Sequence, residues 1–179
     1  MSRRNFSLQP FSPIGPPLTI KITGHITRRP RQLAIRYDLR GDLAEVMIPA
    51  PADIATRRHG LWEETCFEFF LGVKEAPQYW EFNLSPAGHW NVYRFTGYRQ
   101  GMAEETALSS LPMSVRRASN SLRLALEVEV ERIVSADQPL MVGITAVVKL
   151  AGGGLTYWAL IHPGPRADFH RRDSFLVEL

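Results

Sequence analysis

The sequence predicts an all-β protein, a two-layer β-sandwich of the jelly-roll or immunoglobulin-like kind, with about ten strands and minimal helix. Two observations lead to this fold class. Apolar and polar residues alternate with a period of two in short runs along the chain, and turn-forming residues separate these runs at roughly even intervals. Helical periodicity is nearly absent, and 13 prolines and 13 glycines are typical of a chain with many turns.

Alternation is clearest between Ser121 and Glu131, where leucines and valines occupy the even positions and Arg123 and three glutamates occupy odd ones. A strand with one face in the core and the other in water has this pattern. Shorter runs of the same kind predict the other strands, in this order: Leu18–Thr23, Gln32–Asp38, Leu43–Pro49, Thr65–Val73, Gln78–Ser85, Trp90–Thr96, Met113–Ala118, Leu140–Lys149, Leu155–His162 and Phe175–Leu179.

Turn signals stand between the predicted strands. Gly41-Asp42, Pro86-Ala87-Gly88 and Gly152-Gly153-Gly154 are of this kind, and the last predicts a hairpin turn. Helical turns are expected only within Gly101–Leu108 and Glu131–Ala136. The sequence therefore predicts strands along almost the whole chain.

The chain of 179 residues is long enough for one stable domain, expected over residues 18–179 after a Pro-rich arm at 1–17. The net charge of +3 is small, so we expect no nucleic-acid partner. No stretch approaches 18 apolar residues, and the start lacks the apolar segment of a signal peptide. Cys66 is the only cysteine. A cytoplasmic protein without a membrane partner is the simplest interpretation; its oligomeric state stays open.

Polar residues recur among aromatic ones in the middle of the chain. On Thr65–Val73, Glu68 falls opposite the apolar face, and a carboxylate in apolar surroundings needs a partner. The parity of the next two strands offers Glu81, Asn83 and Arg94 as partners. We expect these four polar residues to line one sheet surface bordered by two tryptophans, Trp62 and Trp90. Planar hydrogen-bonding groups flanked by aromatic rings suit a sugar.

Two families share these motifs. Trp62, followed six positions later by Glu68 and then by the strand Tyr79–Pro86 with Gly88 in its turn, resembles family-nine carbohydrate-binding modules. A longer set of motifs resembles bacterial stand-alone DOMON-like proteins: Trp80–Pro86, Tyr93–Phe95, Tyr98–Met102, Tyr157–Leu160, His162-Pro163 and Asp168–Asp173.

The resemblance implies a β-sandwich in which Trp62 stacks on a sugar and Glu68 accepts hydrogen bonds from its hydroxyls. It further implies Trp158 as a second stacking residue and Glu81, Asn83 and Arg94 as polar contacts. The position three after Trp62, acidic in many family-nine modules, is Thr65 here. The metal-binding features of that family are therefore not carried over, and we expect neither metal nor cofactor.

The histidines do not indicate a metal site, because none of the five has the sequence spacing of metal ligands. His162 and His170, near the C-terminus, remain candidates for hydrogen bonds to a ligand. We predict a non-catalytic module that binds a carbohydrate or another small polar ligand through Trp62, Glu68, Glu81, Asn83, Trp90, Arg94, Trp158, His162 and His170, with no catalytic residue.

Three alternatives stay open at this stage. Glu68 or Glu81 could act as the base of an enzyme on a sugar-like metabolite, with Arg94 as electrostatic partner. A haem-binding DOMON domain would need a Met and a His, for which Met102 or Met113 and His89 or His162 are available. Glu68 and Arg94 could also form a buried ion pair that fixes strand register.

Overall fold

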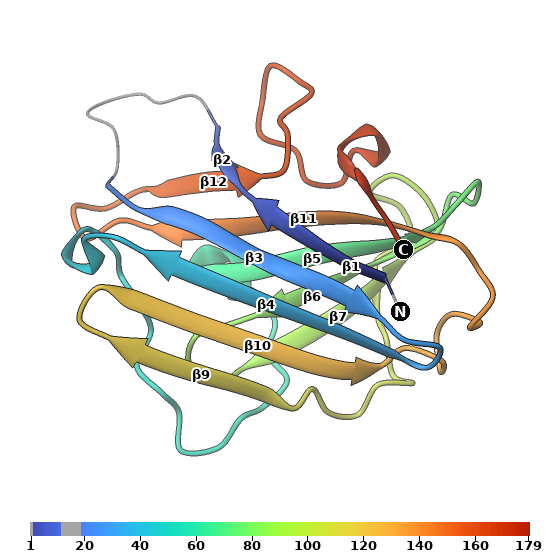
Figure 1. The fold of residues 1–179 in the computed structure, drawn as a ribbon, viewed down its shortest axis with the longest axis horizontal. Helices are drawn as coiled ribbons and strands as arrows, with labels where there is room; N and C mark the ends of the chain where they lie inside the picture. The colour runs from blue at the N-terminus through green and yellow to red at the C-terminus, as the bar shows by residue number, and fades with distance from the viewer. Residues whose placement is uncertain (1, 12–18) are drawn as a thin grey trace.

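The computed structural model describes residues 2–11 and 19–179, and the strands in these ranges form two antiparallel sheets stacked face to face (Figure 1). The five-stranded sheet has the order β1 (Ser2–Ser7), β3 (Lys21–Arg28), β4 (Gln32–Arg40), β10 (Ser121–Glu129), β9 (Met113–Ala118). The eight-stranded sheet has the order β2 (Gln9–Pro10), β12 (Leu155–Ala159), β11 (Leu140–Lys149), β5 (Cys66–Val73), β6 (Tyr79–Leu84), β7 (Trp90–Phe95), β8 (Ala103–Glu104), and β13 (Val177–Glu178) pairs with β11. The predicted two-layer β-sandwich is confirmed.

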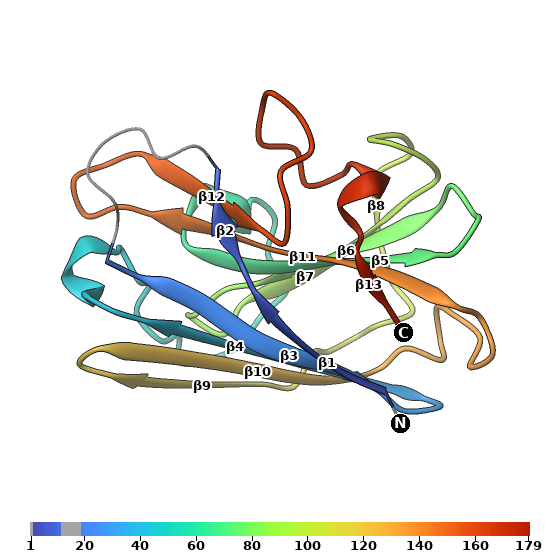
Figure 2. The ribbon, with the colours of Figure 1, turned by 45° about the horizontal axis from the view of Figure 1, so that its top comes forward.

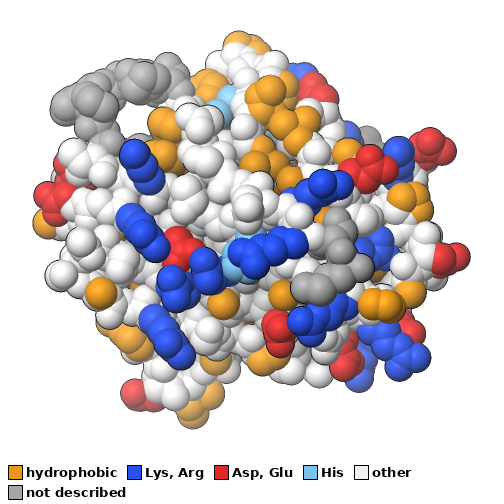
Figure 3. Space-filling model, viewed as in Figure 1, with side chains coloured by type: hydrophobic (Ala, Val, Ile, Leu, Met, Phe, Trp, Pro, Cys, Tyr) orange, Lys and Arg blue, Asp and Glu red, His pale blue; other side chains and the backbone are white. Residues whose placement is uncertain are grey.

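The five-stranded sheet has one buried face and one face in solvent. Along β10 every even residue from Leu122 to Val128 is buried, whereas Glu127 and Glu129 are exposed. On the outer face Asp38 of β4 is 2.9 Å from Arg36 and 2.8 Å from Arg123. Figure 3 shows Lys and Arg side chains distributed across this face. The charged half of the alternating pattern therefore lies on the solvent side.

Between the sheets lies a core of aliphatic and aromatic side chains. Tyr37 of β4 is fully buried there, and its hydroxyl donates a 2.6 Å hydrogen bond to the backbone carbonyl of Glu68 in β5. Its ring contacts Phe67, and Phe69 stacks on Phe82 with centroids 4.3 Å apart. These contacts fix which face of β5 and β6 points inward, and so which residues point outward.

The outer face of the eight-stranded sheet carries a second apolar cluster. Every residue of β5 and β6 is buried, although only alternate side chains of these strands face the other sheet. The C-terminal segment crosses this outer side (Figure 2). The cluster contains the buried aromatics Phe70, Tyr79, Tyr93, Phe95 and Phe175, with Trp62, Met141 and Phe169 packed against them.

Two glycines make room for the C-terminal segment. A Cβ atom on Gly143 of β11 would stand 2.8 Å from the Phe175 ring, and one on Gly72 of β5 would overlap the Arg172 guanidinium. Arg172 also donates a 2.7 Å hydrogen bond to the carbonyl of Val73. The segment thus packs directly on the backbone of two central strands.

Several predicted elements differ in the structure. Leu43–Pro49 is not a strand, because Asp42 accepts a 3.0 Å hydrogen bond from the Ala44 amide and caps a 3-10 turn, η1 (Leu43–Glu45). Gly101–Leu108 contains strand β8, and Glu131–Ala136 forms turns only.

The two remaining 3-10 turns are η2 (Leu61–Glu63) and η3 (Arg172–Ser174). No helix within residues 2–11 and 19–179 is long and apolar enough to cross a membrane.

The expected N-terminal arm is part of the sandwich over residues 2–10. Strand β1 pairs with β3 in one sheet, and β2 pairs with β12 in the other. Residues 2–10 therefore contribute an edge strand to each layer. Residues 12–17 of the expected arm lie outside the described residues.

Candidate functional site

A pocket of about 420 Å³ opens on the outer face of the eight-stranded sheet. Its size lies within the roughly 300–1,000 Å³ typical of small-molecule sites. Central strands supply its floor, and η2, the β7–β8 loop, β12 and the C-terminal segment supply its walls. The lining residues are Trp62, Glu63, Glu68, Phe70, Glu81, Phe95, Arg99, Met102, Val147, Leu155, Tyr157, Ala167, Phe169 and His170.

Strand register brings two carboxyl groups to the pocket floor. Glu68 of β5 pairs with Asn83 of β6, and Phe70 pairs with Glu81. Because side chains two positions apart share a face, Glu68 and Glu81 are diagonal neighbours on the outer face. Both are buried, with 2% of Glu68 and 6% of Glu81 exposed.

One oxygen of the Glu68 carboxyl lacks a partner. Its Oε1 atom is buried and has no hydrogen-bond partner among the described residues. Burial, and then the charge of Glu81, raise the pKa of Glu68 well above its usual range, although hydrogen bonds from Thr145 and Cys66 oppose this shift. Glu68 also lines the pocket, so this incompletely satisfied carboxyl group belongs to its floor.

Glu81 has protein partners on both sides. The Asn83 amide donates a 2.9 Å hydrogen bond to Glu81 Oε1, and His170 Nε2 lies 3.7 Å from Oε2. Burial raises the pKa of this carboxyl too. Two carboxyl groups with raised pKa values therefore lie together at the bottom of the pocket.

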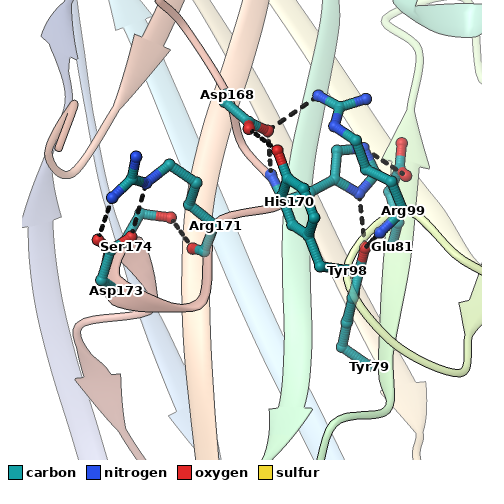
Figure 4. Close-up of polar contacts among 9 residues, drawn as sticks. All are labelled: Tyr79, Glu81, Tyr98, Arg99, Asp168, His170, Arg171, Asp173 and Ser174. Carbon is teal, nitrogen blue, oxygen red and sulfur yellow. Dashed lines mark hydrogen bonds and ion pairs between the residues drawn. The ribbon is translucent and has the colours of Figure 1, made fainter. Parts of the chain in front are cut away.

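His170 is held neutral by its surroundings. Burial, and then the charge of Arg99, lower the pKa of His170 to about 4. The backbone amide of Arg99 donates to the Tyr79 hydroxyl, which lies 2.8 Å from His170 Nδ1 (Figure 4). Tyr79 and Nδ1 thus share a hydrogen bond on one side of the imidazole ring, while Nε2 faces Glu81 on the other.

An ion pair joins the two loops of one pocket wall. Arg99 of the β7–β8 loop lies 2.8 Å from Asp168 of the C-terminal segment, and Tyr98 donates a short hydrogen bond to the same carboxylate (Figure 4). Burial opposes ionisation of Asp168, but these hydrogen bonds from Tyr98 and Arg99 lower its pKa. The pair holds the segment that carries His170 against the sheet.

Trp62 stands at the rim on the turn η2, which Gly60 opens with a positive φ of 74°. The indole is partly buried and meets the rings of His59 and Tyr93 edge-on, with centroids 5.0 and 5.9 Å away. Tyr93 also contacts His59 Nδ1 at 2.8 Å. Neighbouring rings thus fix the orientation of Trp62 beside the pocket.

Five of the nine residues predicted for the site come together. Trp62, Glu68, Glu81 and His170 line the pocket, and Asn83 lies fully buried beneath it, where its amide supports Glu81. The expected strip of polar groups next to a tryptophan is thus present over β5 and β6.

Two residues of β7 were assigned to the wrong face. Trp90 pairs with Leu84 and Arg94 with Trp80, so all four point away from the outer face. Trp90 is 4% exposed in the core between the sheets, and Arg94 is exposed at the sheet edge. The hypothesis of a buried Glu68–Arg94 ion pair is therefore wrong. Arg94 is also not placed to assist a base in the pocket.

Trp158 and His162 were also misplaced. Trp158 pairs with Ala146 and is buried in the core, where its indole donates to Thr156 Oγ1 at 3.0 Å. The outer aromatic residue of β12 is its neighbour Tyr157, which lines the pocket. His162 Nε2 lies 2.9 Å from the Gln9 carbonyl, outside the pocket lining.

Several lining residues were missed by the sequence reasoning. Arg99, Tyr157 and Phe169 belong to motifs on which the family resemblance rests. Arg99 and Phe169 lie in loops, where neither parity nor burial pattern marks a residue, whereas Tyr157 lies on β12, where the resemblance assigned its neighbour Trp158 to the site instead. Of the residues considered for haem, Met102 lines the pocket, whereas Met113, His89 and His162 do not.

Comparison with known proteins shows the fold. No protein-family model matches the chain, and no curated protein matches it. A crystal structure of a Bacteroides uniformis protein proposed to bind carbohydrate is 18% identical, with a TM-score of 0.70 over 96% of this chain and 84% of that one.

Two structures of a family-nine carbohydrate-binding module from Caldicellulosiruptor kristjanssonii are also similar. One is in complex with glucose, at 8% identity over 91% of this chain and 77% of that one. The other is in complex with cellotriose, at 7% identity over 91% and 75%. Both have a TM-score of 0.52. The chain shares the β-sandwich fold of these carbohydrate-binding proteins.

Proposed function

We propose that the protein binds a carbohydrate, without transforming it, in the pocket on the outer face of the eight-stranded sheet. One observation carries the proposal: Glu68, whose carboxyl group has one oxygen without a protein partner, lines a pocket that also has aromatic walls. Sugar hydroxyls would supply hydrogen bonds to Glu68 and Glu81, and their C–H faces would pack on Trp62 and Tyr157. The fold likeness to modules in complex with glucose and cellotriose supports this ligand class.

The test is titration calorimetry with glucose and cellotriose on the intact protein and on Trp62→Ala. We expect the substitution to weaken binding at least about tenfold, because it removes one aromatic wall. Trp62 is only partly buried, so the free energy of unfolding should fall by less than the roughly 3–5 kcal/mol typical of a fully buried Trp.

Ile54→Ala is the matched control, because Ile54 is 74% exposed and does not line the pocket. Its affinity for sugar should equal that of the parent protein. Unchanged binding by Trp62→Ala would show that Trp62, at the rim of the pocket, does not contact the sugar. A Soret band in the purified protein would contradict the sugar proposal in favour of haem.

A further inference from the structure

The pocket lining contains more acidic side chains than basic ones. Three carboxyl side chains line it, from Glu63, Glu68 and Glu81, against the single guanidinium of Arg99 and the neutral His170. The chain as a whole carries a net charge of +3. The excess of acidic side chains is therefore local to the pocket.

The one cation of the lining is already neutralised. Arg99 lies 2.8 Å from Asp168, which also accepts from the backbone amide of His170. Burial raises the pKa of Glu81, although the charge of Arg99 opposes this shift. Arg99 forms its ion pair with Asp168, and no Lys or Arg of the described residues forms an ion pair with Glu68 or Glu81. A neutral hydroxyl could donate to a carboxylate here, but it would not balance the charge of two buried carboxylates.

The walls of the pocket favour a cation as well. The rings of Trp62, Phe70, Phe95, Tyr157 and Phe169 line it. Aromatic faces attract cations, and the attraction increases where water is excluded. The aromatic rings of the walls and the carboxyl groups of the floor thus both favour a cationic ligand.

We propose that the preferred ligand is an amino sugar with a free ammonium group, which Glu68 and Glu81 hold between them. This inference rests on the proposed carbohydrate function and specifies its ligand class. The ammonium offers three hydrogen-bond donors to the Glu68 and Glu81 carboxyl groups, while the ring carbons pack on the aromatic walls.

Binding of an ammonium has a second consequence, the release of a proton. In the empty pocket burial and the proximity of Glu81 favour the protonated form of Glu68. A bound cation stabilises both carboxylates, so the proton leaves Glu68 for solvent while the ligand keeps its charge. A neutral sugar, by contrast, can accept a hydrogen bond from protonated Glu68 without proton release.

The experiment compares glucosamine, N-acetylglucosamine and glucose by calorimetry in two buffers of different ionisation enthalpy. We expect glucosamine to bind at least about tenfold more tightly than either neutral sugar, with proton release for glucosamine alone. Glu68→Gln should abolish both the preference and the proton release. The control Glu129→Gln makes the same chemical change on the exposed side of β10 and should alter neither.

Equal affinities for glucosamine and glucose would overturn the amino-sugar inference and leave the carbohydrate function standing. Tight glucosamine binding that survives Glu68→Gln would overturn the assigned ammonium site. Failure of glucose, cellotriose, glucosamine and N-acetylglucosamine to bind would overturn the proposed function together with the inference.

Discussion

Glu68 is a carboxyl group buried on a strand with one oxygen unpartnered, a position that native folds usually avoid. Its backbone carbonyl accepts a hydrogen bond from the Tyr37 hydroxyl across the core, so the backbone at this position cannot shift without loss of that hydrogen bond. A buried oxygen without a partner lowers the stability of the folded protein. The proposed binding of a ligand in the pocket, which Glu68 lines, is a physical reason for such a group to be retained.

The pH dependence of stability follows from this residue. A raised pKa in the folded state means that folded protein binds the Glu68 proton more tightly than unfolded protein does. The contribution of Glu68 to the free energy of unfolding is therefore largest below the unfolded pKa of about 4.3 and is lost as the pH rises through the folded pKa. Glu68→Gln does not titrate, so its stability relative to the parent protein should increase as the pH rises above about 4.

Urea unfolding at several pH values measures this difference. Arg94→Ala serves as control, because Arg94 is exposed on the opposite face and its stability curve should run parallel to that of the parent protein. Parallel curves for Glu68→Gln would show that Glu68 titrates alike in the folded and unfolded states.

At the residue scale, sequence parity located the site on β5 and β6 and failed on β7. Phe67 and Phe69 define the inner face of β5 without ambiguity, so Glu68 could be placed on the outer face. On β7 large apolar residues occupy both faces, since Val92 points inward and Tyr93 outward. Alternation carries no information about orientation when both faces are buried.

At the element scale, the C-terminal segment depends on glycines in the strands beneath it. Gly143→Ala should lower the free energy of unfolding by about 1–3 kcal/mol, because its Cβ would stand 2.8 Å from the Phe175 ring and force the segment outward. Chemical denaturation checks this value. Gly152→Ala is the matched control, since a Cβ there meets no atom within 4 Å, and a change within about 0.5 kcal/mol is expected.

A loss of stability as small in Gly143→Ala as in the control would mean that the C-terminal segment does not pack on β11 in solution. In that case the wall carrying His170 and Phe169 would also have to be reconsidered, because it belongs to the same segment.

The bounds of several strands could be predicted from the sequence. The bounds of β9 and of the buried strand β11 match the predicted runs, and β10 differs only at its end. Leu43–Glu45 has strand-like composition, yet the Asp42 side chain offers its backbone a local hydrogen bond that a strand lacks. β1 was missed because arginines occupy both of its faces, at Arg3 and Arg4.

At the scale of the whole molecule, the two sheets differ in how deeply they are buried. The five-stranded sheet is covered on one face, whereas β5 and β6 are covered on both, by the core and by the aromatic outer cluster. The pocket therefore stands on the most enclosed part of the structure. A rigid floor limits the conformational entropy lost when a ligand binds.

Amide hydrogen exchange should reveal this difference. We expect the slowest exchange in β5 and β6, whose opening requires most of the structure to unfold, and faster exchange in β9, an edge strand with mostly exposed side chains. Exchange measured by NMR or mass spectrometry tests the order. Equal protection of β9 and β5 would contradict the layered description.

The placement of β1 and β2 at the edges of different sheets has a consequence for synthesis of the chain. Strand β2 pairs with residues 158–159, and β5 has β11 as a neighbour, some seventy residues further on in sequence. During synthesis residues 2–10 therefore cannot complete both of their pairings until residues 158–159 have emerged from the ribosome. Apolar strands such as β5 lack the neighbour β11 for much of that interval, and exposed apolar surface of this kind favours aggregation of a nascent chain.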